Sequence, residues 1–558
     1  MQAHIDPVHR YGEPPRHESD DLRKQMIRRY AIGLLSVLIA VPGMPSPVAH
    51  HASAASQSGE VQAQFQQWMG ANEKLWDPSL KLVHSPEYVA GRRYPGSYLE
   101  DFHYFEKCCE KVRETSGYAL ALLYRDAPGD RQRAAEALES VLKQQYIKPE
   151  GRWFGTFKRS PEEPDPAANA VMWRDYDPNW REFIGTTFEM ILIEFPDRIS
   201  PELSQRLYKS IDLAVQGELA EGRLVPSYTN PALMYGSLWD FAAVHDKNAE
   251  WQKQSETWTE SVYSLFKKYS SFYEYNSPTY YGVDLFALAL WREYGSTEHI
   301  RAMGSEMETI LWGDIAAFYQ PELHNLAGPY DRSYGMDTEM PGGGGGGGVV
   351  DMTGYAVDEH GAPLPSQSKH TGFGFSCPMA ILGTHIPRDA LVKLQSFQGE
   401  HLVRRQISDQ RVATAWIGKH LIFGGEATNK TKDVGRKSQF HPVAIQWRTP
   451  SGEIGWVQVV QSPMIDATAD KQGLTISTTG TIRLRIHAKE LVASQVSQTV
   501  WELPGLHVAV AADPQGTFKV EKADSSLNEY FKVTDNMIDL IYPSITKMRL
   551  DLKADADR

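Results

Sequence analysis

Three segments of the chain gather hydrogen-bonding side chains beside aromatic rings, at points where one predicted element ends and the next begins. They are Asp177–Gly185, Tyr275–Asp284 and Ala327–Asp337. Amides, phenols and a guanidinium occur in them, and such groups can hold a negative charge and transfer a proton. These segments are therefore our candidates for a site that performs chemistry.

Taken together, the segments resemble the polysaccharide lyases built from a helical toroid and a sheet, the group that includes chondroitin, hyaluronate and xanthan lyases. Asn179-Trp180, shortly before an Ile-Gly pair, looks like that group's loop with the asparagine that binds the uronate carboxylate. The segment around Tyr280 is similar to the one that holds its catalytic tyrosine, and Arg332 follows in the same chain order. The motif resemblance covers about residues 170–340. The group has a histidine shortly before the tyrosine, whereas Asn276 stands there in this sequence.

The resemblance implies a β-elimination that removes the proton beside a uronate carboxyl group and expels the glycosidic oxygen. Negative charge on the carboxylate must be neutralised first, which we expect of Asn179 and Asn276. A tyrosine has an ordinary pKa of about 10, and Arg332 is expected to lower that of Tyr280 by stabilising the phenolate. The same tyrosine can return the proton to the leaving oxygen.

The base has two further candidates. Tyr280 follows Asn276 by four residues, so within a helix both lie on one face, and Tyr281 lies about 100° away as the second choice. His324, eight residues before Arg332, is a possible substitute base.

Trp180, Tyr334 and His324 join Asn179 as residues expected to contact substrate. Each motif also has a purely structural interpretation. Asn276 can begin a helix that has proline early in it, with both neighbouring tyrosines in the core. Asn179-Trp180 can be a turn with a buried ring, and Arg332 can form an ion pair with a nearby aspartate.

Two other functions remain open. An inverting glycoside hydrolase on a helical scaffold would use two carboxylates about 6.5–9.5 Å apart, and the available ones are Glu274, Asp284, Asp331 and Asp337. A carbohydrate-binding protein without catalysis would need the aromatic residues alone. The histidines are scattered without the spacing of a metal site, so no metal and no cofactor is predicted.

Periodicity predicts an α+β chain. Apolar residues recur at helical spacing from 59 to about 316, with helices at 130–145, 181–195, 200–220, 231–245, 249–270, 281–294 and 298–317. Helix pairs of this number are compatible with an α/α toroid. From about 371 the pattern changes to short alternating runs without helices between them, which indicates antiparallel strands. We expect a toroid domain over 56–340, a Gly-rich linker or loop over 341–370 that contains Gly342–Gly348, and a β-sandwich domain over 371–558.

Composition narrows the partners. A net charge of −13 without a basic run argues against nucleic acid, so an anionic polysaccharide or oligosaccharide would need a local cationic site. Three cysteines (Cys108, Cys109 and Cys377) do not form a disulfide framework and are expected to be structural.

The first 55 residues have the order of a secretory signal peptide. Arg28 and Arg29 precede an apolar run of about a dozen residues, followed by the small residues Ala52–Ala55, and Met26 is an alternative start. The run is shorter than the roughly 20 residues that span a bilayer. We expect a secreted or periplasmic protein without a membrane span in the mature chain.

Overall fold

The computed structural model describes residues 59–84, 110–336, 376–435, 438–524 and 536–557. All of them belong to one compact unit, Ala49–Arg558. The predicted signal peptide, the Cys108-Cys109 pair and Gly342–Gly348 lie outside the described residues. Cys377 is a buried free thiol.

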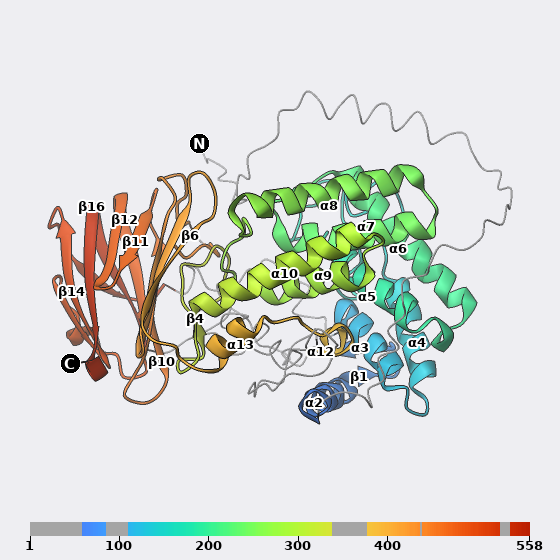
Figure 1. Ribbon diagram of the computed structural model, residues 1–558, viewed down its shortest axis with the longest axis horizontal. Helices are drawn as coiled ribbons and strands as arrows, with labels where there is room; N and C mark the ends of the chain where they lie inside the picture. The colour runs from blue at the N-terminus through green and yellow to red at the C-terminus, as the bar shows by residue number, and fades with distance from the viewer. Residues whose placement is uncertain (1–58, 85–109, 337–375, 436–437, 525–535, 558) are drawn as a thin grey trace, which may run out of the picture. The chain divides into compact units, whose positions relative to one another are not determined.

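The first part of the described chain is helical and confirms the prediction for that region (Figure 1). Its helices are α2 (Gly59–Leu75), α3 (Val112–Arg125), α4 (Asp130–Leu142), α5 (Trp180–Glu194), α6 (Pro201–Glu221), α7 (Thr229–His245), α8 (Ala249–Tyr269), α9 (Tyr281–Tyr294) and α10 (Glu298–Phe318). Consecutive helices from α3 to α10 pack as pairs, and the first members of these pairs, α3, α5, α7 and α9, also contact one another in order. This arrangement is the predicted toroid of helix pairs.

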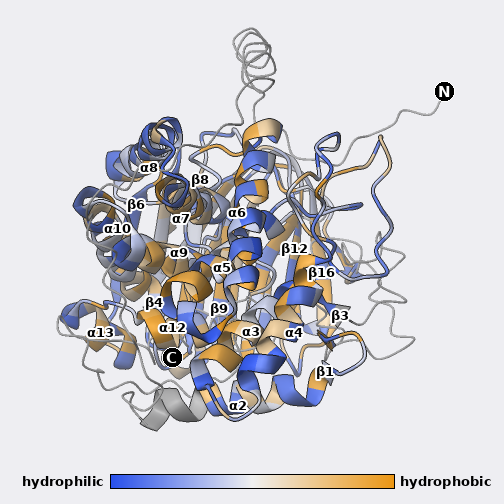
Figure 2. Ribbon diagram, turned by 90° about the vertical axis from the view of Figure 1, so that its right-hand side faces the viewer, coloured by the Kyte–Doolittle hydropathy of each residue, from blue (hydrophilic) through white to orange (hydrophobic). Residues whose placement is uncertain are grey.

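The two layers of the toroid differ in how their residues are buried. Helix α7 is buried on nearly every side, whereas α8 buries a single stripe at helical spacing, formed by Trp251, Ser255, Thr259, Val262 and Phe266. Figure 2 shows α8 as mainly hydrophilic. The difference follows from position, because an inner helix packs against neighbours on both sides and an outer helix faces water on one.

Polar caps fix where several helices begin. Ser200 Oγ accepts a hydrogen bond from the Leu203 amide over 3.2 Å at the start of α6. Asn248 and Thr297 cap α8 and α10 in the same way. The last turn of α6 ends at Gly222, which has a left-handed φ of 60°.

Two short helices precede the long strands. They are α12 (Ser376–Leu382) and α13 (Arg388–Gln395), and they pack against the helical part: α12 on α2, α3 and α9, and α13 on α10. Small sheets also accompany the helices, formed by β1 (Trp76–Asp77), β2 (Leu82–His84) and β3 (Glu110–Lys111), and by β4 (Tyr319–Gln320) and β5 (Asn325–Leu326).

The remaining strands form one antiparallel sheet of eleven strands, which confirms the predicted strand direction. They are β6 (His401–Gln406), β7 (Val412–Ile417), β8 (Leu421–Ala427), β9 (Val443–Arg448), β10 (Ile454–Gln461), β11 (Asp466–Asp470), β12 (Gly473–His487), β13 (Val500–Leu503), β14 (Leu506–Asp513), β15 (Lys519–Lys522) and β16 (Met537–Ala554). The hydrogen-bonded order is β13-β14-β16-β12-β10-β9-β8-β7-β6, with β11 on β12 and β15 on β16. Strand β11 also packs on β7 and β8, so the sheet doubles back on itself.

Strand β8 is buried on both faces and joins the two parts of the fold. A side chain at Gly424 would lie 1.9 Å from the Gly328 carbonyl oxygen, and one at Gly425 would meet Ala467 of β11. The period of two in a strand puts these neighbours on opposite faces. One face of β8 therefore supports the chain that follows β5, and the other supports the rest of the sheet.

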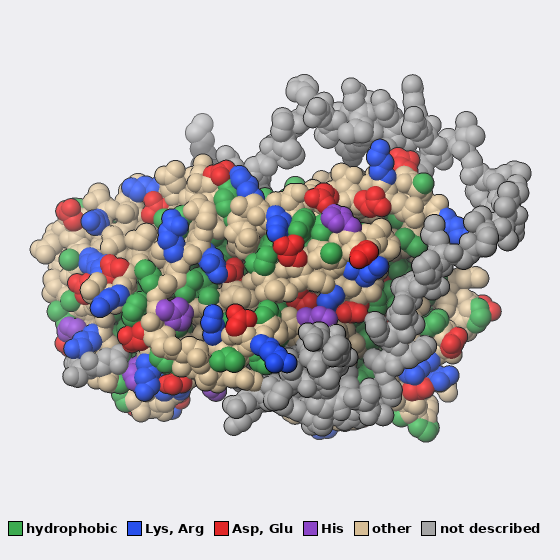
Figure 3. Space-filling model, viewed as in Figure 1, with side chains coloured by type: hydrophobic (Ala, Val, Ile, Leu, Met, Phe, Trp, Pro, Cys, Tyr) green, Lys and Arg blue, Asp and Glu red, His purple; other side chains and the backbone are tan. Residues whose placement is uncertain are grey.

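Among the described residues, none of the helices is long and apolar enough to cross a membrane. On the face drawn in Figure 3, basic and acidic side chains are interspersed over the described elements. That part of the surface offers no extended cationic region for a polyanion.

Candidate active site

The strongest cluster of chemical groups is built around Arg332. Its Nη2 donates to the Tyr280 hydroxyl over 2.9 Å, and its Cζ lies 4.0 Å from the centre of the Tyr280 ring. Tyr280 stands at the N-cap position of α9, directly before the helix begins, and both side chains are partly exposed. A guanidinium held against a phenol oxygen can stabilise that oxygen as a phenolate.

A buried carboxylate fixes the arginine. Glu274 Oε1 accepts from Arg332 Nη1 over 2.8 Å, and its Oε2 accepts from the Thr229 amide at the start of α7 over 3.0 Å. On the third side, Arg332 Nε donates to Gln439 Oε1 over 2.9 Å. Each of the three guanidinium nitrogens thus donates one hydrogen bond within the cluster, which orients the group toward Tyr280.

A second phenol completes the cluster. The hydroxyl oxygens of Tyr280 and Tyr334 are 2.5 Å apart, and the two rings meet edge to face with centres 5.9 Å apart. The Tyr334 amide donates to Thr279 Oγ1 over 3.1 Å, so the residue before Tyr280 fixes the position of Tyr334. Ser277 Oγ likewise donates to the Arg332 carbonyl over 2.6 Å.

Asn179 reaches the same cluster through Tyr228. Its Nδ2 donates to the Tyr228 hydroxyl over 3.2 Å, and the Tyr228 ring lies 5.5 Å from Arg332 Cζ. Asn179 Oδ1 is buried without a hydrogen-bond partner. The structure therefore brings together the three segments singled out in the sequence.

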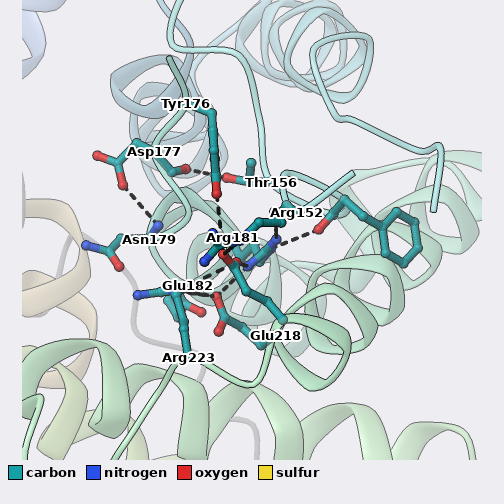
Figure 4. A network of polar contacts seen from close by, with 12 residues as sticks. Arg152, Thr156, Tyr176, Asp177, Asn179, Arg181, Glu182, Glu218 and Arg223 are labelled. Atoms are coloured by element: carbon teal, nitrogen blue, oxygen red, sulfur yellow. Dashed lines mark hydrogen bonds and ion pairs between the residues drawn. The ribbon is translucent and has the colours of Figure 1, made fainter. Parts of the chain in front are cut away.

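A buried charged network fixes the beginning of α5, where Asn179 stands (Figure 4). Arg181 is fully buried and donates to Glu218 over 2.7 Å, to Glu221 over 2.8 Å and to the Phe154 carbonyl over 2.9 Å. These bonds tie the first turn of α5 to the last turns of α6 and to the preceding loop.

The same network shifts the pKa values of two buried carboxyl groups in opposite directions. Burial, followed by the nearby Glu218, raises the pKa of Glu182 well above its ordinary value. Burial alone would do the same to Glu218, but Arg223 and Arg181 hold its pKa below the ordinary value. Contact with the two arginines thus favours the charged form of Glu218, whereas burial favours the neutral form of Glu182.

The sheet holds the Arg332 segment from the other side. Tyr330 pairs with His441 as an antiparallel bridge, and the Ser333 amide donates to the Gln439 carbonyl over 2.9 Å. Between them, Asp331 accepts from Arg411 over 2.6 Å and from Lys432 over 2.5 Å. Arg332 is therefore positioned by segments next to the strands of the sheet, which follow it by roughly 80 to 110 residues in the chain.

The charge state of Tyr280 differs from the expectation. Burial raises the pKa of Tyr280 well above 10, and the neighbouring Tyr334 and Tyr228 add to this, whereas Arg332 acts in the opposite direction. The arginine does stabilise the phenolate, but loss of hydration outweighs it. Tyr280 is therefore a neutral phenol in the ligand-free protein at neutral pH.

Asn276, predicted as a donor to the carboxylate, and Tyr281, the second choice for the base, are both buried and bonded to neighbouring residues. Asn276 is buried with a left-handed φ of 43°, and its side-chain Nδ2 donates to the Ala327 and Pro329 carbonyls over 2.7 and 2.8 Å. The Tyr281 hydroxyl is buried and accepts from the backbone N–H of Asn276 over 2.5 Å. The expectation that Asn276 and Tyr280 share a helical face was wrong, because α9 begins only at Tyr281.

Trp180 and His324 also lie apart from Arg332. Trp180 is 7% exposed within the hydrophobic core, with Arg113 over its ring. His324 is exposed in the turn between β4 and β5, with a left-handed φ of 51°. Their contact with substrate stays a prediction.

The carboxylates considered for a hydrolase are differently engaged. Glu274 is bound by Arg332, and Asp331 by Arg411 and Lys432. Both oxygens of Asp284 are buried without a hydrogen-bond partner, and burial followed by Glu274 raises its pKa well above the ordinary value. Asp337 lies outside the described residues.

Two members of the cluster escaped the sequence analysis. Tyr228 lies in Ser227-Tyr228-Thr229-Asn230, which has the same mixture of polar and aromatic residues at a helix start as the three chosen segments. The composition of this segment could therefore have identified Tyr228 as a candidate. Gln439 has no such signal, because only the pairing of distant segments brings it to Arg332.

The fold and the site together define an α+β protein in which a toroid of helix pairs and an antiparallel sheet hold a tyrosine-arginine-glutamate cluster. The chain belongs to the family described as a domain of unknown function (DUF8769), whose model matches residues 65–358. A second domain of unknown function (DUF8770) matches residues 399–543. A search of curated proteins gives no match.

Several solved structures are similar to this chain. One is heparinase III, with 10% identity and a TM-score of 0.39 over 92% of this chain and 87% of that chain. Another is the chondroitin AC lyase of Streptomyces coelicolor A3 in complex with chondroitin sulphate, with 8% identity and a TM-score of 0.45 over 96% of this chain and 83% of that chain. The predicted resemblance to polysaccharide lyases is thus confirmed among solved structures. TM-scores below 0.5 carry no inference about activity, which must come from the side chains.

Proposed function

We propose that this chain is an exported polysaccharide lyase that cleaves a uronate-containing polysaccharide by β-elimination. The observation that carries the proposal is the Arg332 guanidinium, bonded to the Tyr280 hydroxyl and held there by buried Glu274. A phenol aligned with a fixed cation is a suitable acid and base for removing a weakly acidic C–H proton.

The proposed reaction begins with the uronate carboxylate near Asn179, whose side-chain Nδ2 is a hydrogen-bond donor and contacts the Tyr228 hydroxyl. The Tyr280 phenolate takes the proton from C5, and the electrons of that C–H bond form the C4=C5 double bond. The C4–O bond breaks, and the leaving oxygen receives a proton from a phenol of the cluster. Arg332 lowers the free energy of the phenolate at the step that requires it.

The pKa of Tyr280 gives the proposal a pH signature. Because burial raises that pKa above 10, the phenolate fraction grows throughout the neutral and alkaline range. We expect kcat/KM to rise with pH up to at least pH 9, as long as the fold is intact. An activity that falls between pH 7 and 9 would contradict a tyrosine base.

The direct test is a screen of uronate-containing polysaccharides, among them chondroitin sulphate and heparin, for product with a new C=C bond that absorbs in the ultraviolet. Tyr280→Phe keeps the ring and should reduce turnover by at least about 10²-fold. Tyr208→Phe is the matched control, because Tyr208 is partly buried and stacks on His245 outside the cluster. Near-normal turnover of the Tyr280→Phe enzyme would refute the proposal.

The same screen separates the alternatives. A hydrolase would yield saturated products, and a carboxylate substitution would then disable it while Tyr280→Phe remained mild. The burial of Asp284 and the ion pairs of Glu274 and Asp331 favour the lyase over the hydrolase. Binding of polysaccharide without any product would indicate a carbohydrate-binding protein.

Export is part of the proposal and is supported by the sequence of residues 28–55 alone. Sequencing the N-terminus of the protein isolated from the periplasm or medium tests it. We expect the mature chain to begin near or after residue 55, and a protein recovered only from the cytoplasm with this segment intact would refute export.

A further inference from the structure

The two phenols of the cluster differ in their contacts. Tyr280 is bonded to Arg332, whereas Tyr334 is bonded to Tyr280 and held by Thr279 at its amide. The hydroxyl oxygens of the two tyrosines are 2.5 Å apart, close enough for a proton to pass directly between them.

The geometry also accounts for how the Tyr280 phenol can lose its proton despite its raised pKa. As a phenolate, the Tyr280 oxygen would accept from Arg332 and from Tyr334, and both donors already lie at 2.9 and 2.5 Å. Hydrogen bonds to the charged form favour that form. In this state the Tyr334 proton points toward Tyr280, and it becomes available once Tyr280 has been protonated.

We infer that the acid and the base of the proposed elimination are two different tyrosines, with Tyr280 as the base and Tyr334 as the acid. This inference rests on the proposed function. The Tyr280 phenolate takes the C5 proton, and the C–H electrons form the C4=C5 bond. The C4–O bond breaks, and the leaving oxygen takes the Tyr334 proton. The new Tyr280 proton then passes to the Tyr334 phenolate, which regenerates the Tyr280 phenolate and the Tyr334 phenol.

A substrate with an activated leaving group distinguishes the two roles. Dinitrophenolate attached at C4 of a uronic acid leaves without protonation, so it needs a base and no acid. On a polysaccharide, Tyr334→Phe should lose about 10²- to 10⁴-fold in kcat, whereas on the activated uronate it should stay within about 10-fold of wild type. Tyr280→Phe should be severely impaired on both, and Tyr208→Phe on neither.

A second readout follows the base alone. In D2O, wild type and Tyr334→Phe should both incorporate deuterium at C5 of the recovered polysaccharide faster than Tyr280→Phe, because Tyr280 is the group that removes the C5 proton. Equal loss of Tyr334→Phe on both substrates would overturn the inference and make Tyr334 a binding or positioning residue. Normal turnover of Tyr334→Phe on polysaccharide would overturn it as well.

Failure of the proposed function has a different outcome. If wild type forms no unsaturated product from either substrate, the elimination itself is refuted and the inference falls with it. If wild type and Tyr334→Phe both cleave the polysaccharide while Tyr280→Phe does not, the lyase stands and only the assignment of Tyr334 is wrong.

Discussion

Replacing Arg332 with methionine tests how far the site depends on one buried ion pair. The Arg332 and Glu274 side chains are 15% and 2% exposed and joined at 2.8 Å. Arg332→Met leaves the Glu274 carboxylate buried with only the Thr229 amide as a donor. Removal of one partner from a buried pair costs about 3–5 kcal/mol of unfolding free energy. Glu274→Gln is expected to cost roughly 1–3 kcal/mol, since it leaves a more exposed cation that still contacts Tyr280 and Gln439.

The variant that combines Arg332→Met with Glu274→Gln tests whether the two charges are energetically coupled. Once both charges are gone, its loss of unfolding free energy should be smaller than the sum of the two single losses, with a coupling of about 1–3 kcal/mol. Urea unfolding at pH 7 followed by circular dichroism measures all four proteins. Arg206→Met is the control, because its surface pair with Glu139 should contribute at most about 1 kcal/mol. Strictly additive losses at Arg332 and Glu274 would refute the coupling.

Two further predictions concern stability. Burial raises the pKa of Glu189 to about 8, although the hydrogen bond from Ser237 acts in the opposite direction, so the stability that this group contributes is full below its unfolded pKa near 4.5 and is lost as pH rises toward 8. The free energy of unfolding of wild type should therefore fall by about 1.4 kcal/mol per pH unit between pH 5 and 8 relative to Glu189→Gln. An equal pH dependence of the two proteins in urea unfolding would contradict this prediction. Gly424→Ala should cost roughly 1–3 kcal/mol, because its Cβ would lie 1.9 Å from the Gly328 carbonyl oxygen. The control is Gly313→Ala on α10, whose Cβ would meet nothing within 4 Å, and its free energy of unfolding should rise by about 0.5–1 kcal/mol. Thermal unfolding measures both variants, and equal melting temperatures would refute the clash at Gly424.

The elements with a clear period were the ones that the sequence could predict. The helices from α4 to α10 lie close to their expected ranges, and the run 412–417 coincides with β7. Strand β16 was not expected, and its middle contains Pro543, a residue that weakens a strand pattern. The short helix α12 was missed as well, since seven residues give too little helical period to detect.

Only those site residues could be predicted whose own segments combine polar and aromatic residues. Tyr280, Arg332 and Tyr334 were chosen because polar and aromatic residues occur together in their segments, and the structure joins them. The same criterion selected Trp180, which is buried, because composition does not reveal which way a side chain points. The pKa of Tyr280 also escaped prediction, since it depends on how much water surrounds the phenol.

The bridge between Tyr330 and His441 has a consequence for dividing this protein into parts. The two family models separate the chain between residues 358 and 399, but the backbone that carries Arg332 is held by residues of the second region. A fragment that ends near residue 395 would keep the toroid helices and lose the template that sets the arginine. Adding the separate sheet fragment should restore the position of Arg332, so the two fragments would complement each other in forming the site.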